Sequence, residues 1–210
     1  WRVPGETGLP TELDFSGSSG VTGGAIVWPY PTREKRNGYT DFVYYGPTVL
    51  PIELRLDGAP PVLRLATILG ICSDICVPAQ ADFTLPLDLG TPDRGQDLRI
   101  EQALARTPLP WPDHDAAIGD VAIDAGGGQL AVPIGDPRID PLSVIADAGS
   151  TDLIFGAPQK SQDGKLVLLP LPGGSDAGDL VGQTIQLTFM TPDGPFETSR
   201  RILPSTPDGF

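Results

Sequence analysis

The residues of this chain with the most reactive side chains are its only two cysteines, Cys72 and Cys76, which stand four positions apart. They lie in the segment Gly70-Ile71-Cys72-Ser73-Asp74-Ile75-Cys76-Val77-Pro78. On an extended strand, at about 3.3 Å per residue, the two Cα atoms would be about 13 Å apart. A disulfide needs Cα atoms within about 7 Å of each other. If the cysteines bond, the segment must therefore turn between them, and the flanking Gly70 and Pro78 are consistent with a strand that ends in such a turn.

The short ring that this pair would close indicates a disulfide that opens and closes. On the loop-entropy model a ring of this size contributes about 2 kcal/mol to stability, against nearly 5 kcal/mol for a ring of about 100 residues. Two other interpretations remain open, a local structural staple and a Cu(I) site formed by the two thiolates. No cluster of cysteine and histidine predicts a zinc site. We expect no bound metal and no cofactor.

The residues around the cysteines predict what kind of redox site this would be. The segment contains no Lys, Arg or His, and Asp74 stands between the two thiols. A nearby carboxylate disfavours the thiolate, so neither cysteine should be strongly activated as a nucleophile. This pattern favours a carrier whose thiols wait for an activated partner, and Asp74 is a candidate residue of its binding site.

The elements that must position the pair are short strands. The 210 residues include 26 glycines and 24 prolines, and 40% are hydrophobic, a composition typical of many strands joined by turns. Before and after the cysteines, alternating apolar residues and turn signals predict five strands and one polar turn. The strands are expected at residues 21–28, 39–45, 48–56, 61–70 and 81–89, and the turn at 33–38.

A helix and a Pro-rich segment follow this first group of strands. Thr91 as N-cap and Pro92 at the first position predict a helix that runs to about Arg106. The Pro-rich residues 107–112 are the expected linker. Seven further strands are predicted near residues 119–124, 129–133, 142–146, 151–156, 165–170, 183–190 and 197–203.

The predicted fold is therefore all-β, with two immunoglobulin-like β-sandwich domains joined by a short helix and a Pro-rich linker. The first domain spans residues 1–106 and carries the cysteine pair, the linker spans 107–112, and the second sandwich spans 113–210. The only histidine, His114, stands between two aspartates and is expected to be a solvated surface residue.

The charge of the chain excludes several classes of partner. Against 14 Lys and Arg there are 27 Asp and Glu, a net charge of −13. Phosphate backbones and anionic lipid headgroups would repel such a chain, so we expect neither nucleic-acid binding nor membrane insertion of this fragment. A single close cysteine pair in an acidic all-β chain favours an oxidising compartment.

Four stretches of the first domain resemble one known family. They are Trp1-Arg2-Val3-Pro4-Gly5 with Gly8-Leu9-Pro10, then Trp28-Pro29, Val49-Leu50-Pro51, and Cys72-Ser73-Asp74-Ile75-Cys76-Val77-Pro78-Ala79. The chain is similar in these residues to the N-terminal periplasmic domain of the DsbD/ScsB family of thiol:disulfide interchange proteins. The resemblance covers residues 1–90.

This resemblance implies a periplasmic thiol:disulfide oxidoreductase domain of an inner-membrane protein, with copper tolerance as one family context. It would take electrons from a transmembrane domain of the same protein and reduce periplasmic thioredoxin-fold acceptors. By analogy, Cys76 would be attacked to form the mixed disulfide and Cys72 would resolve it. We expect a monomer. The alternative is an extracellular binding or adhesion module without catalytic activity, whose disulfide is only structural.

The family also covers its disulfide with an aromatic cap loop. Phe42, Tyr44 and Tyr45 are the nearest candidates for such a cap. Aromatic residues along a strand also commonly pack in the core or across strands, so both interpretations of these three residues stay open.

Overall fold

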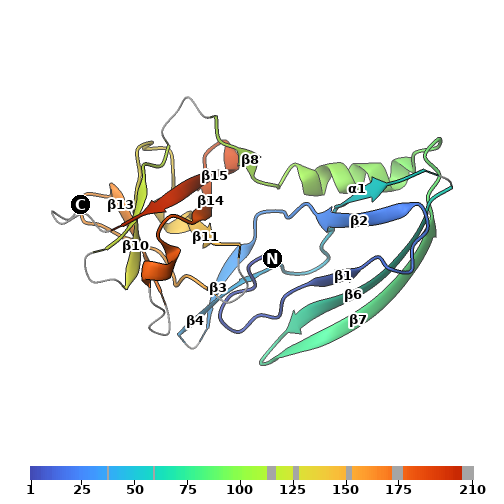
Figure 1. The fold of residues 1–210 in the computed structure, drawn as a ribbon, viewed down its shortest axis with the longest axis horizontal. Helices are drawn as coiled ribbons and strands as arrows, with labels where there is room; N and C mark the ends of the chain where they lie inside the picture. Colours follow the sequence, from blue (N-terminus) through green and yellow to red (C-terminus); the bar gives the residue numbers. More distant parts are fainter. Residues whose placement is uncertain are drawn as a thin grey trace. The chain divides into compact units, whose positions relative to one another are not determined.

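The structure of the chain is a computed structural model, which describes residues 1–36, 38–58, 60–112, 117–124, 128–149, 153–171 and 177–204. The chain divides into two compact units, Trp1–Thr107 and Pro108–Phe210. Within the described residues almost all regular structure is β, with one α-helix in the first unit (Figure 1). The prediction of a mainly β chain is confirmed, and its antiparallel sheets are consistent with immunoglobulin-like folds.

The first unit contains three small antiparallel sheets. The strands of the sheet that carries the cysteines are β1 (Glu12–Asp14), β6 (Val62–Cys72) and β7 (Cys76–Pro86), in the order β1-β6-β7. The other two sheets are the pairs β2 (Val21–Ile26) with β5 (Ile52–Leu56) and β3 (Thr32–Arg36) with β4 (Tyr39–Val43).

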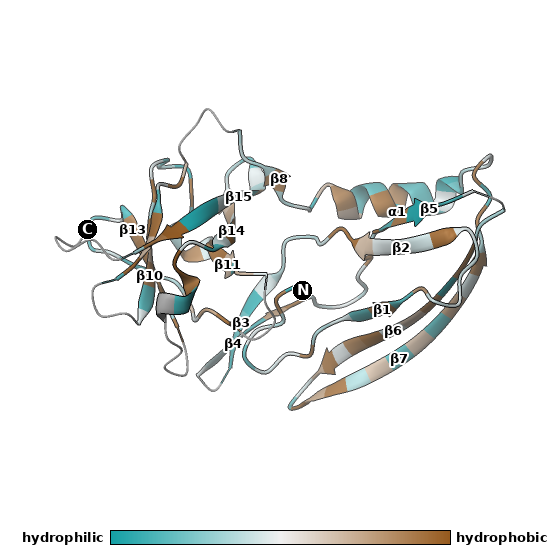
Figure 2. Cartoon of the chain, viewed as in Figure 1, coloured by the Kyte–Doolittle hydropathy of each residue, from teal (hydrophilic) through white to brown (hydrophobic). Residues whose placement is uncertain are grey.

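The long hairpin β6–β7 is the element that positions the cysteines. Its two strands pair over their full length, from Val62 opposite Pro86 to Cys72 opposite Cys76, and hydrophobic residues follow both strands (Figure 2). The sequence predicted shorter strands that stopped before Cys72 and began only after Cys76. The observed strands continue to the cysteines themselves, because register pairing extends a hairpin as far as its turn allows.

The sequence predicts a polar loop or hairpin turn at residues 33–38, and the structure has a hairpin turn there that is shorter than predicted. Thr32–Arg36 forms strand β3, which pairs with the aromatic strand β4 from Thr32 opposite Val43 to Arg36 opposite Tyr39. Strand formation by such polar residues depends on pairing with a neighbour more than on their own propensity. The turn is confined to the residues just before β4, where Gly38 has a φ of +89°.

Helix α1 spans Arg94–Leu104. Its N-cap is Asp93, whose carboxylate accepts hydrogen bonds from the backbone N–H groups of Gly95 at 3.0 Å and Gln96 at 3.3 Å. The predicted N-cap Thr91 is therefore wrong by two residues. A carboxylate satisfies two otherwise unpaired N–H groups of the first turn, which explains why the helix begins after Asp93.

The second unit is built around a continuous path of strands. In sequence order they are β8 (Leu109–Pro110), β9 (Val121–Ile123), β10 (Gln129–Pro133), β11 (Ile145–Asp147), β12 (Gln159–Lys160), β13 (Leu166–Pro170), β14 (Thr184–Thr191) and β15 (Gly194–Leu203). Their spatial order is β11-β14-β15-β9-β10-β13-β12, with β8 paired to β15. Among the described residues of this unit, Pro141–Ser143 and Ala177–Leu180 form 3-10 turns. The predicted strand at 151–156 is not observed at 153–156, and residues 151 and 152 lie outside the described residues.

Strand β15 joins the two halves of this path. It pairs along its length with β14, and its last two residues, Ile202 and Leu203, pair in parallel with Val121 and Ala122 of β9. The core of the unit lies beneath these strands and consists of side chains with almost no exposed surface. Its largest members include Ile118, Leu130, Leu169, Ile185, Leu187, Phe189 and Ile202.

The Pro-rich segment takes part in the second unit. Leu109–Pro110 pairs in parallel with β15, and the backbone N–H of Trp111 donates to the Glu197 carbonyl at 2.8 Å. The Trp111 ring is buried, with its centroid 5.5 Å from that of Phe189 and 5.0 Å from that of Phe196. The domain boundaries at 106 and 113 stay predictions.

The helices of the described segments are short. None of them has both the length and the apolar character that a transmembrane span requires.

Candidate functional site

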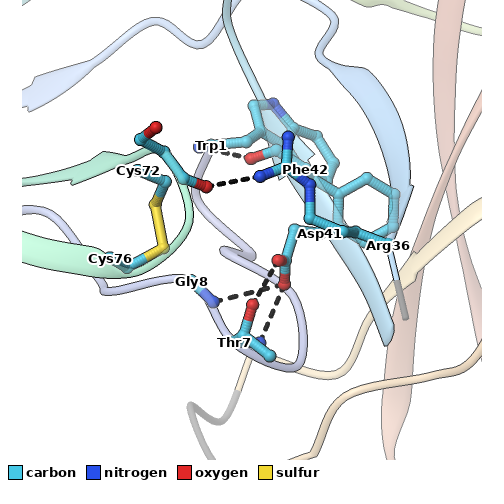
Figure 3. The surroundings of a disulfide bond; sticks show 9 residues. Trp1, Thr7, Gly8, Arg36, Asp41, Phe42, Cys72 and Cys76 are labelled. Carbon is cyan, nitrogen blue, oxygen red and sulfur yellow. Dashed lines mark hydrogen bonds between the residues drawn. A yellow bond between two sulfur atoms is a disulfide. The ribbon is translucent and has the colours of Figure 1, made fainter. Parts of the chain in front are cut away.

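The cysteines form a disulfide at the end of the β6–β7 hairpin (Figure 3). Cys72 is the last residue of β6 and Cys76 the first of β7, and the two stand directly opposite each other with Cα atoms 4.0 Å apart. Only Ser73, Asp74 and Ile75 separate them, and the Ser73 N–H donates to the Ile75 carbonyl at 3.1 Å. The prediction that the segment turns between the cysteines is confirmed.

The disulfide lies in an exposed and mainly apolar setting. Cys72 is exposed and Cys76 is partly buried, while the neighbouring side chains Ile71, Ile75 and Val77 are 60%, 73% and 46% exposed. A partner thiol therefore has access to this end of the hairpin. Cys72 is the more exposed of the two cysteines. The assignment of Cys76 as the attacked residue stays a prediction.

The N-terminal segment lies beside the disulfide. The carboxylate of Asp41, on strand β4, accepts hydrogen bonds from the backbone N–H groups of Thr7 at 2.8 Å and Gly8 at 3.2 Å, and from the Thr7 hydroxyl. Gly5 forms an isolated β-bridge with Asp41, and a Cβ atom at Gly5 would lie only 2.4 Å from the Asp41 Cα. Strand β4 thereby fixes the segment that passes the hairpin end, as Figure 3 shows.

Gly70 allows that segment to approach the hairpin closely. A Cβ atom at Gly70 would lie 3.0 Å from the Cβ and 3.3 Å from the carbonyl oxygen of Leu9. A larger residue at position 70, two positions before Cys72, would push Leu9 away from strand β6. Gly70 is therefore needed for packing of the N-terminal segment against β6. It takes no part in the turn, because it lies within β6 opposite Pro78.

Arg36 also contacts the disulfide loop, although no sequence pattern indicates it as a site residue. It ends strand β3, and its Nη1 donates a hydrogen bond to the carbonyl oxygen of Ser73 in the loop between the cysteines (Figure 3). Its guanidinium also lies 3.8 Å from the Glu34 carboxylate. Arg36 and Ser73 are 37 positions apart, so no local pattern predicts their contact. The cysteine segment itself contains no cation, but the Arg36 guanidinium from another sheet supplies one beside it.

The three aromatic cap candidates make separate contacts. Phe42 is buried, with its ring centroid 5.8 Å from that of Trp1. The Tyr44 hydroxyl donates to the Pro29 carbonyl at 2.6 Å, and burial raises the pKa of this hydroxyl above its usual range. Tyr45 is 63% exposed and donates to the Glu34 carboxylate, which raises the pKa of Tyr45. Their role as a cap stays a prediction.

The described residues contain no group of three or more His, Cys, Asp or Glu side chains that could hold a metal ion. Asp74 is exposed at the tip of the loop. His114 lies outside the described residues.

Comparison with known proteins gives two results for this chain. Residues 1–88 match the family model described as "Thiol:disulfide interchange protein DsbD, N-terminal". The fold is similar to the crystal structure of the N-terminal periplasmic domain of ScsB from Proteus mirabilis, with a TM-score of 0.73 and a sequence identity of 24%. The match covers 97% of this chain and 81% of the ScsB chain. No curated protein sequence matches the chain significantly.

Proposed function

Because residues 1–88 match the family model of the DsbD N-terminal domain, we propose that the first unit is a periplasmic thiol–disulfide exchange domain. The observation that carries this proposal is the Cys72–Cys76 disulfide at the exposed end of a hairpin. Exchange requires that a partner thiolate reach one of the two sulfurs. A disulfide at this position meets that requirement without rearrangement of the sheet.

The proposed reaction passes two electrons and two protons in each half. A thiolate of a donor dithiol, in the transmembrane domain of the same protein, attacks the sulfur of Cys76, and the Cys72–Cys76 bond breaks to give a mixed disulfide through Cys76. The second donor thiol then breaks the mixed disulfide, which leaves the donor oxidised and both cysteines reduced. The reduced pair then reduces a disulfide of a thioredoxin-fold acceptor by the same two steps, with Cys76 as the attacking and Cys72 as the resolving residue.

The hairpin suits a disulfide that opens and closes. The backbone pairing of β6 and β7 places Cys72 and Cys76 opposite each other, and we expect this pairing to persist when the sulfurs are not bonded. On the loop-entropy model, opening so small a ring costs about 2 kcal/mol. The reduced state can thus keep the fold of the oxidised state, as a carrier requires.

The apolar residues around the disulfide supply a surface for the partner. Ile71, Ile75 and Val77 are all exposed next to the cysteines. Apolar side chains that are buried on association contribute to protein–protein contacts in proportion to their area. We propose that these three residues contact the thioredoxin-fold acceptor while the mixed disulfide exists.

We also propose a domain organisation for the chain. Residues 1–106 form the exchange domain, residues 113–210 form a second β-sandwich domain, and the chain is a monomer. The separate hydrophobic core of the second unit supports its assignment as a domain.

A trapping experiment with a matched pair of variants tests this function. The probe is a thioredoxin-fold protein whose second active-site cysteine is replaced by serine and whose first carries a mixed disulfide with thionitrobenzoate. Attack by the free thiolate of a variant releases thionitrobenzoate and leaves a protein–protein disulfide, which no second thiol can resolve. We expect Cys72→Ser to accumulate a covalent adduct through Cys76, and Cys76→Ser to accumulate much less. Equal adducts would contradict the assignment of Cys76. No adduct with either variant, together with a reduction potential well below about −300 mV, would identify a structural disulfide and the non-catalytic binding module.

A further inference from the structure

We propose that Arg36 is a positioning residue of the Cys72–Cys76 disulfide. Its hydrogen bond to the Ser73 carbonyl holds the loop between the cysteines, and its guanidinium places a positive charge beside that loop. The inference rests on the proposed exchange function and deepens it, because it names the residue that adjusts the reactivity of the pair.

The first argument concerns the geometry of the loop. Ser73 directly follows Cys72, and its backbone is held at both polar groups. Its N–H donates to Ile75 within the loop, whereas its carbonyl accepts from Arg36 of another sheet. Arg36 itself is placed by register, as the last residue of β3 opposite Tyr39. The orientation of the loop therefore depends on the β3–β4 hairpin as well as on β6 and β7.

The second argument concerns the charges that surround the loop. Asp74 lies within it, and Asp41 and Glu34 lie on the neighbouring hairpin, where Asp41 accepts three hydrogen bonds from Thr7 and Gly8. Glu34 accepts from Tyr45 and pairs with Arg36. These three carboxylates all disfavour a thiolate, whereas the Arg36 guanidinium favours it.

The direction of the effect follows from the charge of the reduced state. Reduction converts an uncharged disulfide into two thiols, one of which ionises when it attacks the acceptor. A neighbouring guanidinium stabilises that thiolate. It therefore speeds the attack below the thiol pKa, and it favours the reduced state over the disulfide at a pH where the thiolate is populated. Without Arg36 the disulfide should be harder to reduce, and the reduced thiols should react more slowly below their pKa.

The test uses the full chain with glutathione as the only redox partner. At pH 9, where a thiolate is populated, we expect Arg36→Gln to shift the equilibrium with glutathione about threefold toward the disulfide, which is about 14 mV for a two-electron couple. The rate of thiol alkylation at pH 7 should fall about threefold, with its pH profile moved to higher pH. Arg36→Lys, which keeps the charge and a donor, should restore most of both values.

Lys35→Gln is the matched control. Lys35 is the preceding residue of β3 and is exposed, and successive residues of a strand point to opposite faces. This control removes the same charge from the same strand, and we expect no change beyond a small effect of net charge. If Arg36→Gln and Lys35→Gln behave alike, the inference is wrong.

A third variant keeps the inference testable if Arg36→Gln does not fold. Glu34→Gln leaves Arg36 in place and removes the carboxylate that pairs with it, so both measurements should shift in the direction opposite to Arg36→Gln. No shift, or a shift in the same direction, would contradict the inference. Because glutathione is the partner, these results do not depend on thioredoxin-fold exchange, so a failure of the proposed function and a failure of this inference are distinguishable.

Discussion

The two units of the chain reach stability in different ways. Among the described residues, the largest fully buried side chains all belong to the second unit, and they include Phe189, Leu187 and Ile185. In the first unit the described buried apolar side chains are fewer, and apart from proline they are Trp1, Val3, Val21, Phe42, Leu65 and Ala103. Strand β7 even leaves Phe83 and Leu85 each 54% exposed. The unit that carries the disulfide thus depends more on strand pairing and specific hydrogen bonds, and the other on its core.

The comparison predicts that the largest loss of stability comes from the second core. Phe189→Ala should lower the free energy of unfolding by about 4 kcal/mol, because it leaves a cavity beneath β14 and removes the contact with Trp111. Chemical denaturation followed by circular dichroism, with amide exchange of residues 184–191, measures this loss. The exposed Leu142→Ala is the control, with an expected change within about 0.5 kcal/mol.

Two outcomes of this experiment would break the comparison. Equal losses in Phe189→Ala and Leu142→Ala would mean that the core does not determine the stability of the second unit. A large change in the glutathione equilibrium of Cys72–Cys76 in Phe189→Ala would mean that the site in the first unit depends on that core.

Phe42 tests the first unit in the same way. Phe42→Ala should cost about 3 kcal/mol, somewhat less than at Phe189, because its smaller cluster with Trp1 can relax into the space. Tyr45→Ala, exposed at 63%, should change stability little. If instead Phe42→Ala leaves stability intact and only speeds reduction of the disulfide, Phe42 acts as a cap and not as a core residue.

The disulfide itself should matter less than either phenylalanine. Replacement of both Cys72 and Cys76 by serine should lower the free energy of unfolding by about 2 kcal/mol, since a five-residue ring restricts the unfolded chain only slightly. Denaturation of the double variant beside the oxidised protein measures the loss. A loss of about 4 kcal/mol or more would indicate a structural staple and would contradict a carrier role.

The sequence predicts those parts of the first unit that depend on local chemistry. The turn between Cys72 and Cys76 follows from the distance limit of a disulfide, and the strands around it follow from alternating apolar residues. The polar strand β3 could not be predicted, because its residues are strand-forming only when paired with β4.

The candidate site is predictable only in part, for a related reason. Arg36 reaches Ser73 across 37 positions, and that contact depends on how the sheets pack, which no single-sequence pattern encodes. The aromatic residues illustrate the same limit: Phe42 is buried and Tyr45 is exposed although they stand three positions apart in the same stretch. In the second unit, β10 lies at the predicted residues 129–133 and β14 within one residue of the predicted 183–190, because the apolar side chains of both strands are buried. The short strands β8 and β12 were not predicted, because two residues carry no periodic pattern.

The smallest predicted effect concerns an ion pair on the second unit. The Asp136 carboxylate accepts a hydrogen bond from Nη2 of the Arg138 guanidinium at 2.7 Å and another from the Arg138 backbone N–H at 2.8 Å. These two hydrogen bonds hold the pKa of Asp136 below its ordinary value. A lowered carboxyl pKa contributes stability above the ordinary pKa of about 4, and this contribution is lost as the pH falls through the folded-state pKa.

Arg138→Gln removes the guanidinium and keeps the backbone donor, so the pKa of Asp136 should rise only part of the way to its ordinary value. An NMR titration of the Asp136 carboxyl carbon measures that rise, and Asp163, whose pKa is lowered mainly by Ser161, serves as the internal control and should not move. The unfolding midpoint at pH 7 should change far less than in Phe189→Ala, because the pair is solvent-accessible and such pairs contribute little. If Arg138→Gln destabilises the second unit as much as Phe189→Ala does, then polar contacts and not its core hold that unit together, and the two units do not differ in the way their burial indicates.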